Sequence, residues 1–141
     1  MLMTNGRPPV LLTLGLVAAI AVELLVMQPY SAPSPWQPYV APARRYLHAA
    51  LARDSVALEE QSVSSAPVAW ALHAGRTAPK TLAVWVARLR PAGGRRWGDT
   101  TDVMFETSTE VCEFRPILMR FVGQDGVPHV LMATSSCFGP P

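Results

Sequence analysis

The chain has 141 residues, a formal net charge of +2 at pH 7 and two cysteines. Basic and acidic residues are interspersed, so the sequence has no basic block of the kind that marks a nucleic-acid-binding surface. Residues 44–141 are enough to form one hydrophobic core, but they are too few for two domains.

Residues 9–28 form an apolar run that contains a single carboxylate, Glu23. At 1.5 Å per residue, a helix of this length is roughly 30 Å long, which matches the hydrocarbon core of a bilayer. The run is longer than the apolar core of a signal peptide, and no well-placed small-residue cleavage site follows it. We therefore predict that residues 1–28 form a cytoplasmic stub and an uncleaved transmembrane helix.

The basic residues on either side of this helix predict its orientation. Arg7 precedes the helix, whereas the first basic residues after it are Arg44 and Arg45. The positive-inside rule then puts the N-terminus in the cytoplasm and residues 44–141 outside it. In a bacterium, this predicts a single-pass protein of the inner membrane with a periplasmic domain.

One face of the predicted membrane helix carries Gly15, Ala19 and Glu23, which are spaced four residues apart. Small residues allow a second helix to approach closely, and a carboxylate within a membrane usually faces a partner or water. This face therefore predicts a helical membrane partner. The alternative is that Glu23 lies close enough to the interface to reach lipid headgroups by itself.

Residues 29–43 contain five prolines, which disfavour a helix or a central strand and favour polyproline II. Three aromatic residues, Tyr30, Trp36 and Tyr39, are distributed along this linker. They predict a strap that docks along a neighbouring protein, and an aromatic belt at the lipid headgroups is an equally good interpretation.

The first half of residues 44–141 has helical patterns. Apolar spacing predicts a helix over residues 43–53, and Asp54 is a natural N-cap for a second helix that ends near residue 61. A third helix is predicted from Ser65 to a stop at Gly75. The segment Pro79–Arg90 fits both a helix and a strand, and the start signal before it favours a helix.

The second half has the patterns of a β-sheet. After a turn at Pro91–Gly94, apolar and polar residues alternate over residues 101–110, which indicates a half-buried strand. Residues 117–122 and 129–135 are two further strands, joined by a turn at residues 123–126. Helices followed by three or four antiparallel strands predict an α+β domain.

The helix, the turn Arg53-Asp54-Ser55, the further helices and the late sheet together resemble the NTF2-like superfamily. The resemblance spans residues 43–138 in outline and implies a curved sheet that wraps as a cone around an N-terminal helical layer. It also implies either a pocket for a small apolar ligand or an active site with acids or a histidine inside the cone. No motif in this chain assigns such catalytic residues.

The two cysteines, Cys112 and Cys137, are an even pair in a compartment predicted to be oxidising, which predicts a disulfide bond between them. The alternative is two unpaired buried thiols. No CxxC or HxxxH spacing accompanies them, and the three histidines are isolated in the sequence. We therefore expect no metal site and no cofactor.

A short segment combines the glycines at positions 93, 94 and 98 with Arg95, Arg96 and Trp97. As a loop, it would bring two cations and an indole to anionic headgroups or to an acidic patch of a partner. The alternative interpretation is an ordinary loop with solvated arginines.

Taken together, these patterns predict a non-catalytic, single-pass accessory subunit that docks on and stabilises a larger integral membrane complex. By analogy with small single-pass subunits of energy-transducing assemblies, the complex is expected to be a photosynthetic reaction centre with its light-harvesting proteins, or a respiratory complex. The alternative is a membrane-tethered NTF2-like module that binds a small apolar ligand or a lipid.

Overall fold

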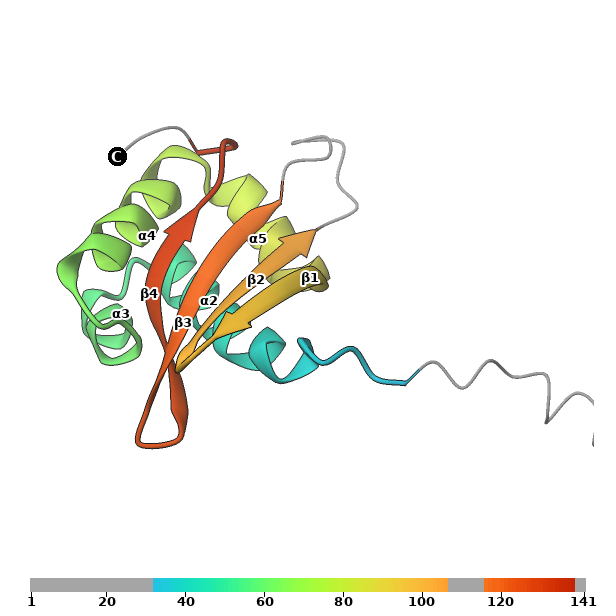
Figure 1. Cartoon of the computed structure of the whole chain (residues 1–141). Helices are drawn as coiled ribbons and strands as arrows, with labels where there is room; N and C mark the ends of the chain where they lie inside the picture. Colours follow the sequence, from blue (N-terminus) through green and yellow to red (C-terminus); the bar gives the residue numbers. More distant parts are fainter. Residues whose placement is uncertain (1–31, 107–115, 139–141) are drawn as a thin grey trace, which may run out of the picture. The chain divides into compact units, whose positions relative to one another are not determined.

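The computed structural model describes residues 32–106 and 116–138 (Figure 1). Contacts divide the chain into two compact units, Met1–Pro33 and Ser34–Pro141, of which the second contains every described helix and strand. The elements of the second unit are η1 (Gln37–Tyr39), α2 (Val40–Ala52), α3 (Ser55–Gln61), α4 (Ser65–Thr77), α5 (Pro79–Arg88), β1 (Arg90–Trp97), β2 (Thr100–Glu106), β3 (Ile117–Gln124) and β4 (Val127–Thr134).

The described part of the domain is an antiparallel sheet with a layer of helices on one side (Figure 1). The four strands lie in the order β1-β2-β3-β4, so each strand pairs with its neighbour in the chain. Helices first and an antiparallel sheet second is the predicted α+β class, which is confirmed. The predicted membrane span lies outside the described ranges, within which no helix is long and apolar enough to cross a bilayer.

The ambiguous segment at Pro79–Arg90 is helical from Pro79 to Arg88, as α5. Leu82 and Trp85, three residues apart, are both buried in the core, which is the spacing of one helix face. The predicted turn at Pro91–Gly94 and the loop after it are wrong, because these residues form the edge strand β1. An edge strand tolerates a proline, and a bulge between Pro91 and Gly93 absorbs the irregular sequence.

The turn at Arg53-Asp54 ends α2 and begins α3. Arg53 adopts a left-handed conformation with φ of 56° and donates its backbone N–H to the end of α2. Asp54 is the N-cap of α3, and its Oδ1 accepts the Ala57 N–H at 3.1 Å. The predicted cap is therefore confirmed.

Helix α2 begins earlier than predicted. The linker was expected to exclude a helix through residue 43, but α2 already starts at Val40, and the compact unit starts at Ser34. Pro42 lies in the first turn of α2, where a backbone N–H has no partner within the helix and its absence costs nothing.

Helix α4 runs to Thr77, past its predicted stop at Gly75. Gly75 is not a cap but a point of close approach between two helices. A Cβ atom at this position would lie 2.1 Å from the backbone oxygen of Ala50 in α2. Because the obstacle is backbone, only glycine allows α4 to pack this closely on α2.

The core fills the space between the helices and the sheet. Its largest fully buried side chains include Tyr46, Trp85, Phe105 and Phe121. The buried Tyr46 hydroxyl donates a hydrogen bond of 2.5 Å to the Pro67 carbonyl oxygen, so its polar end is satisfied. These side chains occupy the helix-covered side of the sheet, where a cone would hold a ligand.

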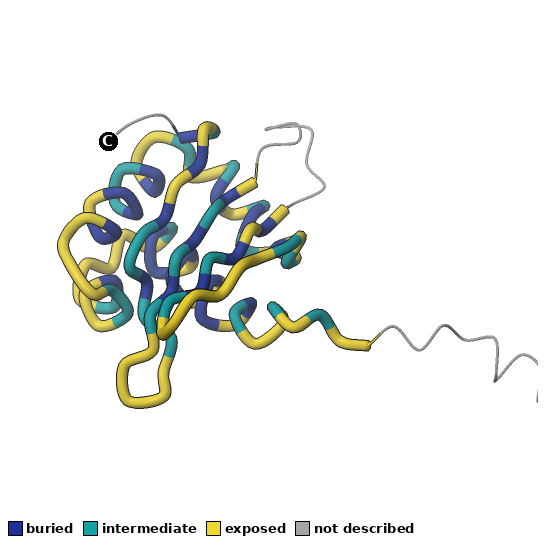
Figure 2. The backbone as a smooth tube through the Cα atoms, in the orientation of Figure 1, coloured by how far each residue is buried: buried dark blue, intermediate teal, exposed yellow. Residues whose placement is uncertain are grey.

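Burial alternates along the strands, as the sequence predicts (Figure 2). In β2, the side chains of Thr101, Val103 and Phe105 are buried and those between them are more exposed. The last four residues of the predicted strand, 107–110, lie outside the described residues. The hairpin between β3 and β4 is tighter than predicted, since only Asp125 and Gly126 form the loop, both with positive φ.

Replacing Gly75 by alanine is predicted to destabilise the domain by about 1–3 kcal/mol, because α2 and α4 must separate to admit the Cβ atom. The measurement is chemical denaturation of the full chain, followed by near-ultraviolet circular dichroism. The matched control is Gly123→Ala, because nothing lies within 4 Å of a Cβ atom placed there. Equal loss of stability in both variants would contradict the close-approach argument.

Candidate functional site

The side of the sheet that faces away from the helices is the candidate site. Directly opposite residues on antiparallel strands lie on the same face, so the register assigns the members of this surface. We call it the outer sheet face, and its members are Arg90, Gly93, Arg95, Trp97, Thr100, Asp102, Met104, Glu106, Leu118, Arg120, Val122, Gln124, Val127, His129, Met132 and Thr134. No described helix covers this face (Figure 1).

On the outer sheet face, an exposed indole at the end of the edge strand β1 lies between two guanidinium groups. The Cζ atoms of Arg95 and Arg120 lie 4.8 and 5.1 Å from the ring centroid of Trp97, and the indole is still 40% exposed. Both distances are within the range of a cation–π interaction. Arg95 is on the same strand as Trp97, and Arg120 reaches it from β3.

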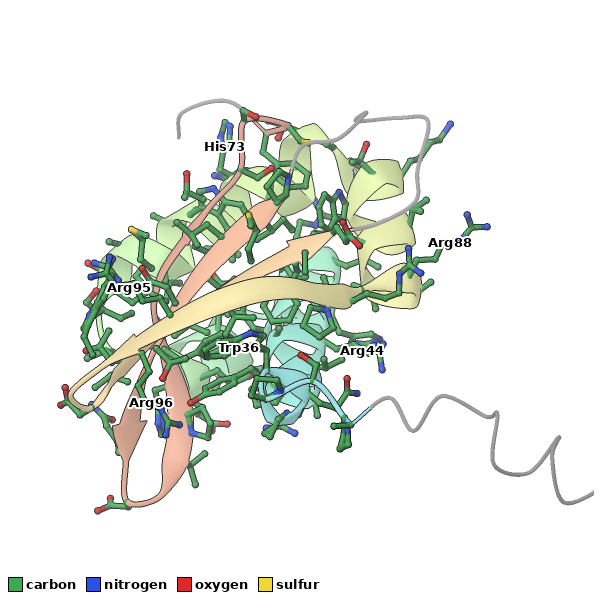
Figure 3. All side chains as sticks on the ribbon, turned by 45° about the vertical axis from the view of Figure 1, so that its right-hand side comes forward. Trp36, Arg44, His73, Arg88, Arg95 and Arg96 are labelled. Atoms are coloured by element: carbon green, nitrogen blue, oxygen red, sulfur yellow. The ribbon has the colours of Figure 1, made fainter. Side chains whose placement is uncertain are left out.

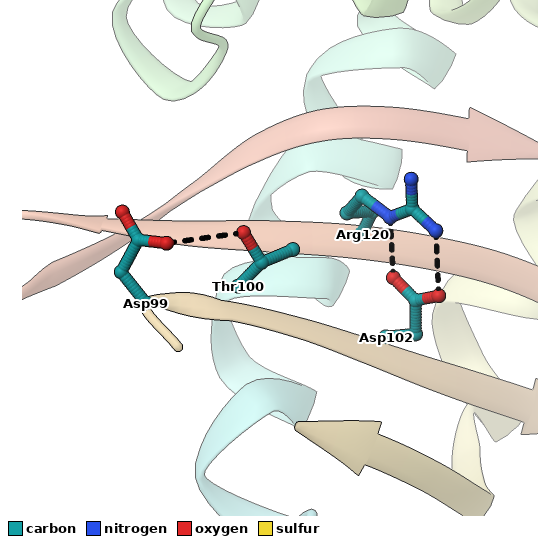
Figure 4. Close-up of polar contacts among 4 residues, drawn as sticks. All are labelled: Asp99, Thr100, Asp102 and Arg120. Carbon is teal, nitrogen blue, oxygen red and sulfur yellow. Dashed lines mark hydrogen bonds and ion pairs between the residues drawn. The ribbon is translucent and has the colours of Figure 1, made fainter. Parts of the chain in front are cut away.

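A bidentate ion pair holds Arg120 in place (Figure 4). Its Nε and Nη2 donate to the two carboxylate oxygens of Asp102 at 2.6 and 2.8 Å, directly across β2 and β3. Donating hydrogen bonds to the Asp102 carboxylate raises the pKa of Arg120, so this guanidinium keeps its charge. The Asp102 carboxylate is only 13% exposed and is therefore committed to this pair.

Apolar side chains surround this cluster. Met104 is 40% exposed and Val127 is 49% exposed, whereas Leu118, Val122 and Met132 are half-buried. Of the five large hydrophobic side chains that are exposed in the described ranges, three lie on this face: Trp97, Met104 and Val127. Tryptophan, arginine and methionine are the residue types enriched in protein–protein interfaces.

Arg96 does not belong to this surface, although the sequence grouped it with Arg95 and Trp97. Successive residues on a strand point to opposite sides, so Arg96 lies on the other face of β1 (Figure 3). Its Nη2 donates to the Tyr39 hydroxyl at 3.0 Å, and its Nε donates to the Thr101 hydroxyl at 3.3 Å. The predicted three-residue loop is thus divided by the pleat of a strand.

Two aromatic residues of the predicted linker, Trp36 and Tyr39, contact the domain of their own chain. The Tyr39 hydroxyl donates to the Thr101 hydroxyl at 3.0 Å, and its ring centroid lies 5.1 Å from that of Phe121. The Trp36 ring packs over β1 at Gly94, where a Cβ atom would be only 2.8 Å from the indole. Docking on a neighbouring protein is therefore proposed below for the outer sheet face rather than for these two side chains.

The exposed edge of β1 is a poor site for pairing with another strand. It contains Pro91, the adjacent bulge and three charged side chains, which are devices that prevent edge-to-edge pairing. The opposite edge, at β4, is partly covered because the Val63 N–H donates to the Val130 carbonyl oxygen at 3.0 Å. The face of the sheet, rather than its edges, is thus the surface available to a partner.

The remaining predicted site residues are placed as follows. Gly15, Ala19, Glu23, Tyr30 and Cys112 lie outside the described residues, so the membrane-partner face and the Cys112–Cys137 disulfide stay predictions. Two of the histidines have separate backbone partners. His73 contacts the Phe138 carbonyl oxygen at 3.2 Å, and His129 contacts the Val127 carbonyl oxygen at 3.1 Å. Within residues 32–106 and 116–138, no three potential metal ligands gather.

Arg120 was not among the predicted site residues, although the sequence contains one indication of its role. Arg120 interrupts the apolar run Ile117–Val122, in which the other outward side chains, Leu118 and Val122, are apolar. A charge in that position requires a partner across the strand, and Asp102 is that partner. Asp102 itself was predicted to lie on the solvated face of β2, which agrees with its place on the outer sheet face.

Compared with models of protein families, with curated proteins and with solved structures, the chain has no match.

The two described tyrosines are predicted to titrate on opposite sides of the ordinary pKa of 10.0. Burial by itself raises the pKa of Tyr39, but hydrogen bonds with Thr101 and Arg96 and the charge of Arg96 outweigh it and lower the pKa. Burial raises the pKa of Tyr46. The measurement is an alkaline titration of the full chain followed by tyrosinate absorbance, in which Tyr39→Phe removes the earliest step.

The two shifts have opposite effects on stability. The contribution of Tyr39 is complete above pH 10 and is lost as the pH falls through its lowered pKa. The contribution of Tyr46 is complete below pH 10 and is lost as the pH rises toward its raised pKa. An unchanged earliest step in the Tyr39→Phe variant would contradict the hydrogen-bond network described for Tyr39.

Proposed function

We propose that this protein is a non-catalytic, membrane-anchored accessory subunit whose domain docks through the outer sheet face on a larger integral membrane complex. The observation that carries the proposal is the exposed Trp97 between Arg95 and Arg120, with Met104 and Val127 also exposed on the same face. An exposed tryptophan with arginines beside it and exposed apolar side chains on the same face has the composition typical of interaction hot spots.

The pairing of Arg120 with Asp102 favours burial of this face. An unpaired charge is expensive to remove from water, whereas a bidentate pair that is already formed leaves much less to desolvate. Arg95 has no carboxylate partner among the described residues. The complementary surface would therefore present an apolar recess for Trp97 with an acidic side chain at its rim for Arg95.

The membrane anchor supports the same proposal. Residues 9–28 would hold the protein in the bacterial inner membrane with a cytoplasmic N-terminus and a periplasmic domain. The compact unit begins at Ser34, so the free linker would shrink to residues 29–33, about 15 Å when extended. A tether this short would restrict partners to proteins of the same membrane. By analogy, we propose an energy-transducing complex, either photosynthetic or respiratory.

Truncating the anchor of the outer sheet face is predicted to release the protein from its complex. The variants are Trp97→Ala and Met104→Ser, and each is expected to weaken association by about 2 kcal/mol or more if it is at a hot spot. The measurement is gentle detergent extraction of native membranes, native electrophoresis and mass spectrometry of the proteins that co-migrate with the full chain.

The matched control is Val56→Ser. Val56 is 64% exposed and lies on α3, in the helical layer rather than on the sheet, so this variant removes a surface hydrophobic side chain elsewhere. It is expected to co-migrate normally. Co-migration of the Trp97→Ala variant at full stoichiometry, or migration of the unaltered chain by itself, would contradict the proposed function.

A separate prediction tests the membrane helix. Gly15→Leu or Ala19→Leu would place a bulky side chain on the face that is proposed to contact a partner helix, and would release the protein in mild detergent. A leucine at Ala21, which would lie on the opposite side of the predicted helix from Ala19, is the control. Equal retention of all three variants in the complex would count against a helix partner at this face.

A further inference from the structure

The helical layer carries an open groove of about 620 Å³ along the exposed side of α2. Helices α3 and α5 both pack on α2 and form the two walls. Small apolar side chains line much of the groove: Ala41, Ala49 and Ala52 from α2, Ala57 from α3 and Val86 from α5. Its volume is within the range of roughly 300–1,000 Å³ that single small ligands occupy.

Basic side chains line the same groove. Arg44, Arg45 and His48 project from successive turns of α2. Arg44 is fixed at the rim because its Nε donates to the Val86 carbonyl oxygen at 3.0 Å (Figure 3). Neither Arg44 nor Arg45 forms an ion pair with a carboxylate in the described part of the chain.

The one carboxylate that lines the groove has another role. Asp54 caps α3 by accepting the Ala57 N–H, so its charge is directed at the start of that helix. The groove thus combines an apolar floor with two guanidinium groups that lack a partner among the described side chains. An apolar floor beside two cations is complementary to a molecule with an apolar body and an anionic end.

We infer that this groove binds a single acyl chain that ends in an anionic head, with the chain along the alanine floor and the head at Arg44 and Arg45. This site is distinct from the interior of a cone, which buried aromatic side chains fill. It is also distinct from the outer sheet face, because it lies on the exposed side of the helical layer. Ligand and protein partner therefore use different surfaces.

The experiment uses the full chain in nanodiscs of phosphatidylcholine and two photoreactive probes. One probe is a diazirine fatty acid, and the other is phosphatidylglycerol with a diazirine in its acyl chain. After illumination, peptide mass spectrometry locates the label. The expected result is labelling of α2, α3 and α5 by at least one probe, and the probe that labels them distinguishes a free fatty acid from a membrane lipid.

Two sets of variants test the floor and the head site separately. Ala41→Leu with Ala52→Leu fills the groove at positions that are exposed, so the core is left intact. Arg44→Gln with Arg45→Gln removes the charges. Each pair is expected to lower labelling about tenfold, which corresponds to about 1.4 kcal/mol of affinity. The control Ala69→Leu, at an exposed position on α4, is expected to leave labelling unchanged.

Three results would overturn the inference. They are no labelling of these helices by either probe, equal labelling by an uncharged diazirine fatty alcohol, and equal loss of labelling in the Ala69→Leu control. None of these results bears on co-migration with a membrane complex. Ligand binding in the groove and docking through the outer sheet face can thus be confirmed or contradicted independently.

Discussion

The close packing of α2 on its neighbours is the constraint on which the rest of the domain depends. One side of α2 is buried through Ala43, Tyr46, Leu47 and Ala50, and the Ala50 backbone oxygen meets α4 at Gly75 without room for a side chain. Such contact fixes α4, and α4 in turn packs on β4. The described helices therefore all pack on one side of the sheet. The other side is left uncovered by them and faces water or a partner.

The sequence predicted the parts of this architecture that depend on local chemistry. The Asp54 side chain accepts the N–H of the residue three positions later, which is a local contact that the sequence alone indicates. The alternation from Thr101 to Phe105 fits a strand, because only a period of two residues puts its apolar side chains on one buried face. The strand β1 could not be predicted in the same way. Pro91, Gly93 and Gly94 are turn residues by propensity, and only pairing with β2, which is a tertiary contact, makes them a strand.

The candidate site also depends on tertiary contacts that the sequence alone does not indicate. Arg95, Arg96 and Trp97 are adjacent in sequence, but as residues of a strand they divide between two surfaces with different tasks. Arg95 and Trp97 join Arg120, which is distant in sequence, on the outer face. Arg96 instead completes a network with Tyr39 and Thr101. Side chains in a loop do not alternate between two faces. Because residues 93–98 were predicted to be a loop, Arg96 was wrongly grouped with Arg95 and Trp97.

The attachment of Trp36 and Tyr39 to their own domain has a consequence for how specificity would arise. Tyr39 of η1 contacts the sheet through a hydrogen bond and a ring contact, so η1 belongs to the same compact unit as the sheet and the proposed tether would leave from that unit. An exit point within that unit and a short tether would limit the orientations that the domain can take in a membrane. Fewer accessible orientations reduce the entropy lost on docking, which raises the affinity that a modest surface can reach. A face whose exposed aromatic side chain is a single tryptophan would be a weak binder in free solution, and the proposed tether would supply the high effective concentration that makes docking on a neighbour in the same membrane favourable.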